Sequence, residues 1–275
     1  MDLGGIIWLF ILFVGLQPLV RQRLLDWQRR QQLARIQKAR GSRVILLVHR
    51  QEVMRLFGVP LVRYIDLNDA EEVLRAIQLT DDATPIDLIV HTPGGLVLAA
   101  LQIARALKDH PARVTIFVPH LAMSGGTLIA LAGDEIVMCR HALLGPCDPQ
   151  INGLPAASLL RVLRSKPVAE IDDQTLALAD LGEKAIAQLR LAVEELLAGT
   201  VAEAARDRLA DDLTRGRWTH DFGITSAQAR QFGLPVSEDV PPAILELMAL
   251  YPQPVRGVPS VEYLPAPPPV RPHRR

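Results

Sequence analysis

Segments of apolar, β-rich sequence alternate with segments of helical periodicity between residues 43 and 138, and this alternation constrains the fold more than any other feature of the chain. Four short runs have the apolar, β-branched character of buried strands: residues 43–49, 86–91, 114–118 and 135–138. Helical spacing occupies the intervening residues: 69–79, 96–109 and 123–133. Strands that alternate with helices in this way predict parallel βαβ units, and hence an α/β fold.

Beyond residue 138 the sequence predicts further helices and then an unstructured tail. Helical spacing extends over residues 170–213, with breaks expected at Gly182 and Gly199, and a last helix is expected over residues 241–250. Residues 251–275 are rich in proline and basic residues and are expected to be extended and disordered. The globular domain is therefore expected to span residues 41–250.

The segment from Leu3 to Val20 is an unbroken uncharged run of about the length needed to cross a bilayer. A cleaved signal peptide is the alternative interpretation. Two observations oppose it: Asp2 rather than a basic residue precedes the run, and no small-x-small cleavage site follows it. Residues 1–20 are therefore expected to form an uncleaved, single-pass transmembrane anchor.

Basic residues are concentrated directly after this run, over residues 21–40. Because positive charge is retained on the cytoplasmic side, we expect the chain beyond the anchor to lie in the cytoplasm, at the inner (cytoplasmic) membrane. Residues 21–40 have helical spacing, with sparse apolar positions among arginine and glutamine. They are interpreted either as a solvated juxtamembrane helix or as a basic helix lying against anionic headgroups.

Composition argues against several classes of function. The 30 basic and 30 acidic residues cancel, and aromatic residues make up only 4% of the chain, so we expect no nucleic-acid partner. The two cysteines, Cys139 and Cys147, have no CxxC or Cys/His spacing; they are expected to be reduced thiols, and no metal site is predicted. No GxxxxGK[ST] phosphate loop occurs, and no cofactor is predicted.

Two glycine pairs stand where a predicted strand gives way to a predicted helix. The first lies in His91–Gly95 and the second in Ala122–Thr127, which also contains Ser124. A tight turn that opens a helix exposes unpaired backbone N–H groups, which can bind an oxyanion. Ordinary turn glycines and a helix-capping serine are the structural alternative for either motif alone. Their occurrence one βα unit apart favours a nucleophile beside an oxyanion site.

The stretch of residues 87–151, which contains both motifs, resembles the Clp protease-like serine peptidases. Within them it is most similar to the serine dehydrogenase proteinase family, close to signal peptide peptidase A; that name refers to proteolysis of such a dehydrogenase, not to dehydrogenase activity. The resemblance extends over residues 42–236. It implies a crotonase-like fold, with the repeated ββα units of ClpP, and self-association into a homo-oligomer.

The resemblance also implies roles for individual residues. It implies Ser124 as the nucleophile. The implied oxyanion hole consists of backbone N–H groups of the two turns, those of Gly94, Gly95 and Gly125.

A serine nucleophile needs a base, and the sequence leaves several candidates open. In the soluble Clp-type peptidases a histidine follows the nucleophile, but the corresponding residues here, 144–149, include none. The signal peptide peptidase branch uses a lysine, which makes Lys166 the first candidate and Lys184 the second. A lysine base must be neutral; the basic neighbours of Lys166 favour that form, whereas Glu183 beside Lys184 opposes it. Ordinary surface lysines are the alternative.

His220 and Asp221 provide a third possibility for the base. Counted back from Gly233, Asp221 aligns with the acid of the soluble Clp-type triad, and His220 beside it could act as a base. The pair could equally stabilise a turn. Asp148, which stands where the missing histidine would be, could orient a base or cap a helix.

Peptide hydrolysis is the leading functional hypothesis, with a protein or peptide as substrate, Ser124 as nucleophile and Lys166 as base. A catalytically inactive scaffold at the membrane is an alternative, supported by the proline-rich tail, which could dock on partner grooves. Acyl-CoA hydration or hydrolysis is a third hypothesis, because crotonase-like folds perform it with similar oxyanion turns. That hypothesis gives no reason for a serine at the second turn.

Overall fold

The computed structural model describes residues 3–49, 55–56, 59–60 and 63–251. Its centre is a five-stranded sheet in the order β1-β4-β5-β7-β12, with every neighbouring pair parallel. The strands are β1 (Arg43–Val48), β4 (Ile86–His91), β5 (Val114–Val118), β7 (Glu135–Met138) and β12 (Val236–Ser237). The predicted α/β fold and its four predicted strands are therefore confirmed, and β12 was not predicted.

A second, smaller sheet stands beside the carboxyl ends of the main strands. Its order is β11-β8-β6, formed by β6 (Leu121–Ala122), β8 (Leu143–Leu144) and β11 (Ile224–Thr225). The remaining strands of the described chain form two antiparallel two-stranded sheets: β2 (Arg55–Leu56) pairs with β3 (Val59–Pro60), and β9 (Gln150–Ile151) pairs with β10 (Leu154–Pro155). Because β5 and β7 are each followed by a short strand of the second sheet, the chain repeats a long strand, a short strand and then a turn or helix.

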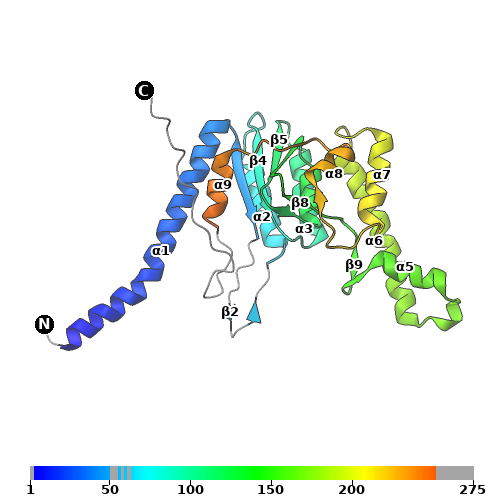
Figure 1. Cartoon of the computed structure of the whole chain (residues 1–275), viewed down its shortest axis with the longest axis horizontal. Coiled ribbons are helices and arrows are strands. Elements are labelled where there is room, and N and C mark those ends of the chain that lie inside the picture. The colour runs from blue at the N-terminus through cyan, green and yellow to red at the C-terminus, as the bar shows by residue number, and fades with distance from the viewer. Residues whose placement is uncertain (1–2, 50–54, 57–58, 61–62, 252–275) are drawn as a thin grey trace, which may run out of the picture.

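Helices cover both faces of the main sheet (Figure 1). The α-helices of the described chain are α1 (Leu3–Arg40), α2 (Leu67–Gln78), α3 (Val97–Lys108), α4 (Gly125–Leu131), α5 (Ala156–Ser165), α6 (Asp173–Leu197), α7 (Glu203–Thr214), α8 (Ser226–Gln231) and α9 (Pro242–Ala249). Side chains of β4 alternate between the two faces, as a strand requires. Leu88 and Val90 belong to the larger core with α2, α3 and α4, whereas Ile89 packs in a smaller core with Ile36 of α1 and Ile244 of α9.

Two helices differ locally from expectation: α2 begins at Leu67 rather than at residue 69, and α6 has no break in its middle. The N-cap of α2 is Asp66, whose side chain accepts from the Asp69 backbone N–H while the Asp69 side chain accepts from the Asp66 N–H, a reciprocal capping box. α6 continues through Gly182, where a break was predicted. A Cβ at Gly182 would lie 3.1 Å from the Ala156 Cβ, so the glycine gives α5 room to pack closely. The stability gained from that packing outweighs the low helix propensity of glycine.

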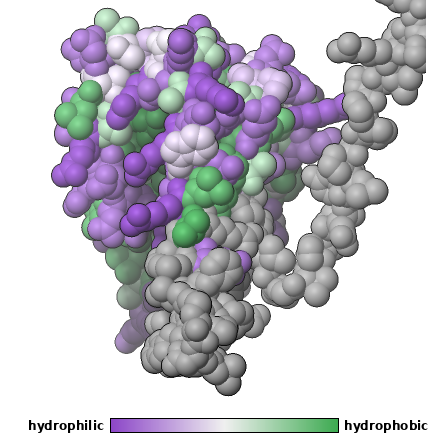
Figure 2. All heavy atoms as spheres, turned by 90° about the vertical axis from the view of Figure 1, so that its left-hand side faces the viewer, coloured by the Kyte–Doolittle hydropathy of each residue, from purple (hydrophilic) through white to green (hydrophobic). Residues whose placement is uncertain are grey.

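α1 is one continuous helix of 38 residues, and its C-terminal part is built into the domain. Ile36 is 2% exposed, the Gln32 amide donates to the Glu246 carboxylate at 2.9 Å, and Arg40 binds the buried Asp87 on β4. The C-terminal part of α1 therefore packs against the domain through one face, that of Gln32 and Ile36, while Arg35 and Lys38 are exposed. Figure 2 shows that the described part of this side of the molecule is mostly hydrophilic, with smaller hydrophobic areas.

The two ends of the chain leave some predictions untested. Among the residues that the structure describes, no helix combines the length and the apolar character needed to cross a membrane. The predicted disorder of the proline-rich tail concerns residues 252–275, which lie outside the described residues.

Candidate active site

Ser124 occupies a strained backbone position between β6 and α4. It is the N-cap of α4, with φ 50° and ψ −113°, and is one of two non-glycine residues with positive φ in the described chain. Such a conformation costs about 1–3 kcal/mol and is retained where the surrounding structure enforces it, often at functional sites. A serine on a sharp, strained turn that leads from a strand into a helix is the geometry that exposes a nucleophilic hydroxyl.

The turn that contains Gly94 and Gly95 faces this serine. A Cβ at Gly94 would lie 2.9 Å from the Ser124 Cβ, and a Cβ at Gly95 would lie 2.3 Å from backbone N and O atoms of Ile65. Neither position has room for a side chain, so both require glycine. Hydrogen bonds hold the turn between its neighbours: Ile65 N–H donates to the Gly94 carbonyl at 2.8 Å, and Leu96 N–H donates to the Ile65 carbonyl at 2.9 Å.

The three predicted oxyanion donors are not equivalent. Gly94 N–H donates to the Thr92 hydroxyl oxygen at 3.1 Å, so this N–H is already engaged. Gly95 N–H and Gly125 N–H have no hydrogen-bond acceptor within the part of the chain that the structure describes. The two turns come close to each other, because a Cβ on Gly125 would lie 3.5 Å from the Gly95 nitrogen. The donors available to an oxyanion are therefore those of Gly95 and Gly125.

A histidine and a carboxylate from distant parts of the sequence meet beside these turns. His220 Nδ1 lies 2.8 Å from Asp148 Oδ1, and the Asp148 side chain is 2% exposed. The Gln150 amide donates to Asp148 Oδ2 at 2.7 Å, so both carboxylate oxygens are held. The hydrogen bond that Asp148 accepts from His220 raises the pKa of His220 above its usual value, against partial burial, and the charges of Asp148 and Asp221 add smaller contributions in the same direction.

These groups line one cavity of about 360 Å³. Ser124, Gly95, Asp148 and His220 all contribute to its surface. The apolar part of the wall comes from both halves of the domain: Leu96, Val97, Leu128, Cys147 and Leu189. A serine side chain, a histidine held by a buried carboxylate, and the glycine that carries a free backbone N–H thus share one cavity.

The two lysine candidates lie elsewhere. Lys166 is exposed at the C-terminal end of α5, and Lys184 is exposed on α6, where it forms an ion pair with Asp180 at 2.6 Å. Neither lines the cavity that contains Ser124. Asp221 is also exposed, so Asp148 rather than Asp221 is the carboxylate in contact with His220.

Sequence reasoning did not identify Gln150 or the partnership of Asp148 with His220. No local pattern signals either, because a hydrogen bond between residues 72 positions apart depends on the packing of α5, α6 and α7 between them.

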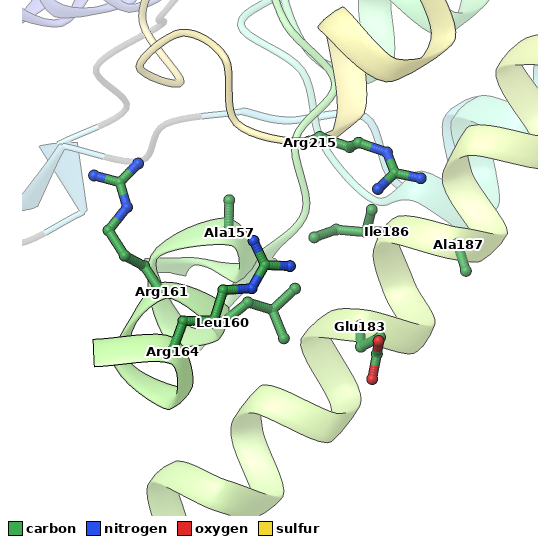
Figure 3. A pocket seen from close by; sticks show the side chains of 8 residues that line it. All are labelled: Ala157, Leu160, Arg161, Arg164, Glu183, Ile186, Ala187 and Arg215. Carbon is green, nitrogen blue, oxygen red and sulfur yellow. The ribbon is translucent and has the colours of Figure 1, made fainter. Parts of the chain in front are cut away.

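A second cavity, of about 320 Å³, lies between α5 and α6 and shares no lining residue with the first (Figure 3). Arginine side chains surround it: Arg161, Arg164 and Arg215. Across the described residues, no group of His, Cys, Asp and Glu has the arrangement of a metal site.

Comparison with known proteins adds independent information. Residues 2–274 match the family of ClpP-like SDH-type serine proteinases. Two uncharacterized proteins of Methanocaldococcus jannaschii are similar over nearly their whole length. One is 45% identical over 267 residues, covering 97% of this chain and 90% of the relative, and the other is 47% identical over 260 residues, covering 94% and 91%. Among solved structures, a mutant of a membrane-bound stomatin-specific protease in complex with a substrate peptide is 22% identical, with a TM-score of 0.45 over 66% of this chain and 74% of that chain.

Proposed function

The chain belongs to the ClpP-like SDH-type serine proteinases, and on this premise we propose that it hydrolyses peptide bonds with Ser124 as the nucleophile. One observation carries the assignment: Ser124 stands on a strained turn in the same cavity as the His220–Asp148 pair. Backbone strain of this kind is expected at a nucleophile. The helix-cap interpretation does not account for it, since the Ser124 side chain makes no capping hydrogen bond.

In the proposed reaction the Ser124 hydroxyl attacks the scissile carbonyl carbon while His220 accepts its proton. Because Nδ1 of His220 is held by Asp148, Nε2 is the nitrogen that takes the proton, and Asp148 stabilises the imidazolium that forms. Gly95 N–H and Gly125 N–H bind the developing oxyanion. Collapse of the tetrahedral intermediate breaks the C–N bond, and His220 returns the proton to the leaving amine. Water, activated by the same histidine, then hydrolyses the acyl-enzyme.

The competing assignment for the base is a lysine, Lys166 or Lys184. Its support is the resemblance to the signal peptide peptidase branch, whereas the contacts of His220 support the histidine. The scaffold hypothesis and acyl-CoA chemistry receive no specific support from the site, because neither requires a histidine–carboxylate pair beside a serine.

The proposal extends to the setting of the enzyme. We propose a crotonase-like peptidase that is tethered to the inner membrane by residues 1–20, acts on the cytoplasmic side and self-associates. The uncharged run from Leu3 to Val20, followed by the basic residues of 21–40, supports the tether. The family resemblance supports the homo-oligomer.

A fluorophosphonate probe tests the nucleophile directly. We expect the full-length protein in detergent to be labelled and to cleave a peptide library, and Ser124→Ala to lose both properties while remaining folded. His220→Ala is expected to lower kcat by about 10²-fold or more, and Lys166→Met and Lys184→Met to leave it within about two-fold. A Lys166→Met or Lys184→Met variant with the larger loss would transfer the role of base to that lysine. A folded wild-type protein that is neither labelled nor active would support the scaffold hypothesis instead.

A further inference from the structure

A buried histidine outside the catalytic cavity is connected to the oxyanion turn. His49 directly follows β1 and is 7% exposed. Its Nε2 lies 3.1 Å from Asp69 Oδ2 in the first turn of α2, and its Nδ1 lies 2.9 Å from the hydroxyl oxygen of Thr92. The proposed mechanism makes no use of this histidine, although a buried polar group of this kind is costly unless its partners are fixed.

Thr92 is the residue through which His49 reaches the site. It is fully buried, and its hydroxyl oxygen accepts from Gly94 N–H at 3.1 Å. The Thr92 backbone joins the two catalytic turns, because its N–H donates to the Leu121 carbonyl at 3.1 Å and its carbonyl accepts from Met123 N–H at 3.0 Å. The Thr92 hydroxyl therefore binds the residue directly before Gly95, whose N–H is the proposed oxyanion donor.

When His49 is neutral, the donor and the acceptor of each hydrogen bond in this network can be assigned from the groups that are able to donate. The Asp69 carboxylate can only accept, so Nε2 of His49 carries the hydrogen and Nδ1 is left as an acceptor. The Thr92 hydroxyl then donates to Nδ1 at 2.9 Å in preference to the Gly94 carbonyl oxygen at 3.3 Å, and its oxygen accepts from Gly94 N–H. Asp69 is fixed in turn, since the same Oδ2 also accepts from Asp66 N–H at 2.9 Å in the capping box of α2. Each polar group of the network has a partner.

We propose that Asp69, His49 and Thr92 position the oxyanion turn, so that the first turn of α2 sets the orientation in which Gly95 N–H points at the reacting carbonyl. This inference rests on the proposed hydrolytic function. Fixing Gly94 N–H to Thr92 limits rotation of the following peptide, which carries the Gly95 N–H. The three side chains are positioning residues: they do not line the cavity that contains Ser124. Their loss is expected to weaken binding of the transition state more than binding of the substrate.

Paired substitutions at Thr92 separate the hydroxyl from the shape of the side chain. Thr92→Val keeps the shape and removes the hydroxyl, whereas Thr92→Ser keeps the hydroxyl. We expect Thr92→Val to lower kcat by about 10- to 100-fold with KM within about two-fold, and Thr92→Ser to stay close to wild type. Thr115→Val is the matched control, because Thr115 is a buried threonine (3% exposed) near the opposite end of the neighbouring strand β5. It should leave kcat unchanged.

A second substitution tests whether His49 acts through Thr92. His49→Ala is expected to lower kcat to a similar extent. The double variant with Thr92→Val should have a kcat no lower than either single variant, because both substitutions remove the same connection. Amide hydrogen exchange of the peptide covering residues 92–96 supplies a readout that needs no catalysis. Exchange there should accelerate in Thr92→Val and His49→Ala and stay at the wild-type rate in Thr115→Val.

The outcomes separate this inference from the function on which it rests. An active wild-type enzyme whose Thr92→Val variant keeps kcat and exchange at wild-type values overturns the positioning role and leaves the peptidase assignment intact. Additive losses in the double variant overturn the connection between His49 and Thr92. A wild-type protein without Ser124-dependent activity overturns the proposed function and with it any catalytic meaning of the network, even if exchange shows that the turn is held.

Discussion

At the residue scale, the site depends on backbone positions that tolerate only particular side chains. Gly94, with φ 115°, and Ser124, with φ 50°, hold two turns against each other, and Gly95 approaches the backbone of Ile65 more closely than any side chain would allow. The strain at Ser124 must be offset by the packing around it, since positive φ is unfavourable for a serine. Positions 94 and 95 therefore require glycine for the two turns to meet.

Gly95→Ala is expected to lower stability as well as activity. The added methyl would lie 2.3 Å from the Ile65 backbone, which cannot move without breaking the two hydrogen bonds that hold the turn. We expect a loss of about 3 kcal/mol or more in the free energy of unfolding, measured by urea denaturation. Gly153→Ala is the control: it has positive φ but no atom within 4 Å of the added methyl, so it should cost only about 1–2 kcal/mol. Equal losses in the two variants would contradict the steric argument.

Asp148→Asn is expected to change the pH dependence of hydrolysis in a definite direction. Asp148 raises the pKa of His220, and a general base works in its neutral form, so activity should fall as the pH drops through that raised pKa. Without the negative charge the pKa of His220 falls, and the acidic limb of kcat/KM should move to lower pH. The plateau should also fall, by about 10²-fold, because the imidazolium loses its partner. An acidic limb that stays in place in Asp148→Asn would indicate a base other than His220.

At the scale of elements, α1 connects the segment nearest the proposed membrane tether to β4, an inner strand of the sheet. Arg40, at the end of α1, binds Asp87 on β4, and Ser42 donates to the same carboxylate at 2.6 Å. Arg29 donates to the Leu250 carbonyl at 2.9 Å and lies over the ring of Tyr251, which joins α1 to the end of α9. The helix is thus a structural part of the domain from about Arg29 onward.

Arg40→Met is expected to destabilise the protein because it leaves the buried Asp87 carboxylate without its positive partner. Asp87 has a side chain that is 3% exposed, whereas that of Arg40 is 33% exposed, so water can compensate in part. We expect a loss of about 3 kcal/mol in the free energy of unfolding. The double variant Arg40→Met/Asp87→Asn should recover part of that loss, since it removes the uncompensated charge. A double variant less stable than Arg40→Met would contradict this explanation.

At the scale of the whole molecule, the arrangement of layers places the site at the carboxyl ends of the parallel strands, where β4 and β5 lead into the two glycine turns. α1 and α9 lie on one side of the main sheet, while α5 and the first turns of α6 extend away from its body (Figure 1). The cavity draws residues from the sheet ends, from α6 and from the loop before β11. Its lining residues therefore come from well-separated positions between Tyr64 and His220.

Removal of residues 1–20 tests the proposed tether. The full-length chain is expected to sediment with membranes and to be released by detergent but not by high salt, because an apolar span resists salt and a purely electrostatic contact does not. The truncated chain should appear in the soluble fraction and still react with the fluorophosphonate probe. A variant that lacks residues 252–275 is the control and should stay with the membrane. A truncated chain that sediments like the full-length protein would contradict the tether.

Much of the fold was predictable because its signals are local. Apolar runs of strand length predicted β1, β4, β5 and β7 with bounds close to those observed, and the glycine pairs marked the two turns that meet at Ser124. The local signals failed where long-range packing decides. Gly182 was read as a helix break but is the point at which α5 crosses α6, and Gly94 N–H, which stands in the same motif as Gly95, is engaged by Thr92.

The sequence by itself determined the parallel α/β class, the strand-to-helix turns and the serine between them, because periodicity and turn chemistry are properties of neighbouring residues. Only the tertiary structure decided which other groups line the cavity that contains this serine. Asp148 and His220 are 72 positions apart, and no pattern in the intervening helices records that their side chains come within 2.8 Å. The same is true of His49 and Thr92, whose contact exists because β1 and β4 are adjacent in the sheet. Distances between side chains are set by the packing of layers, and that packing is a property of the whole chain.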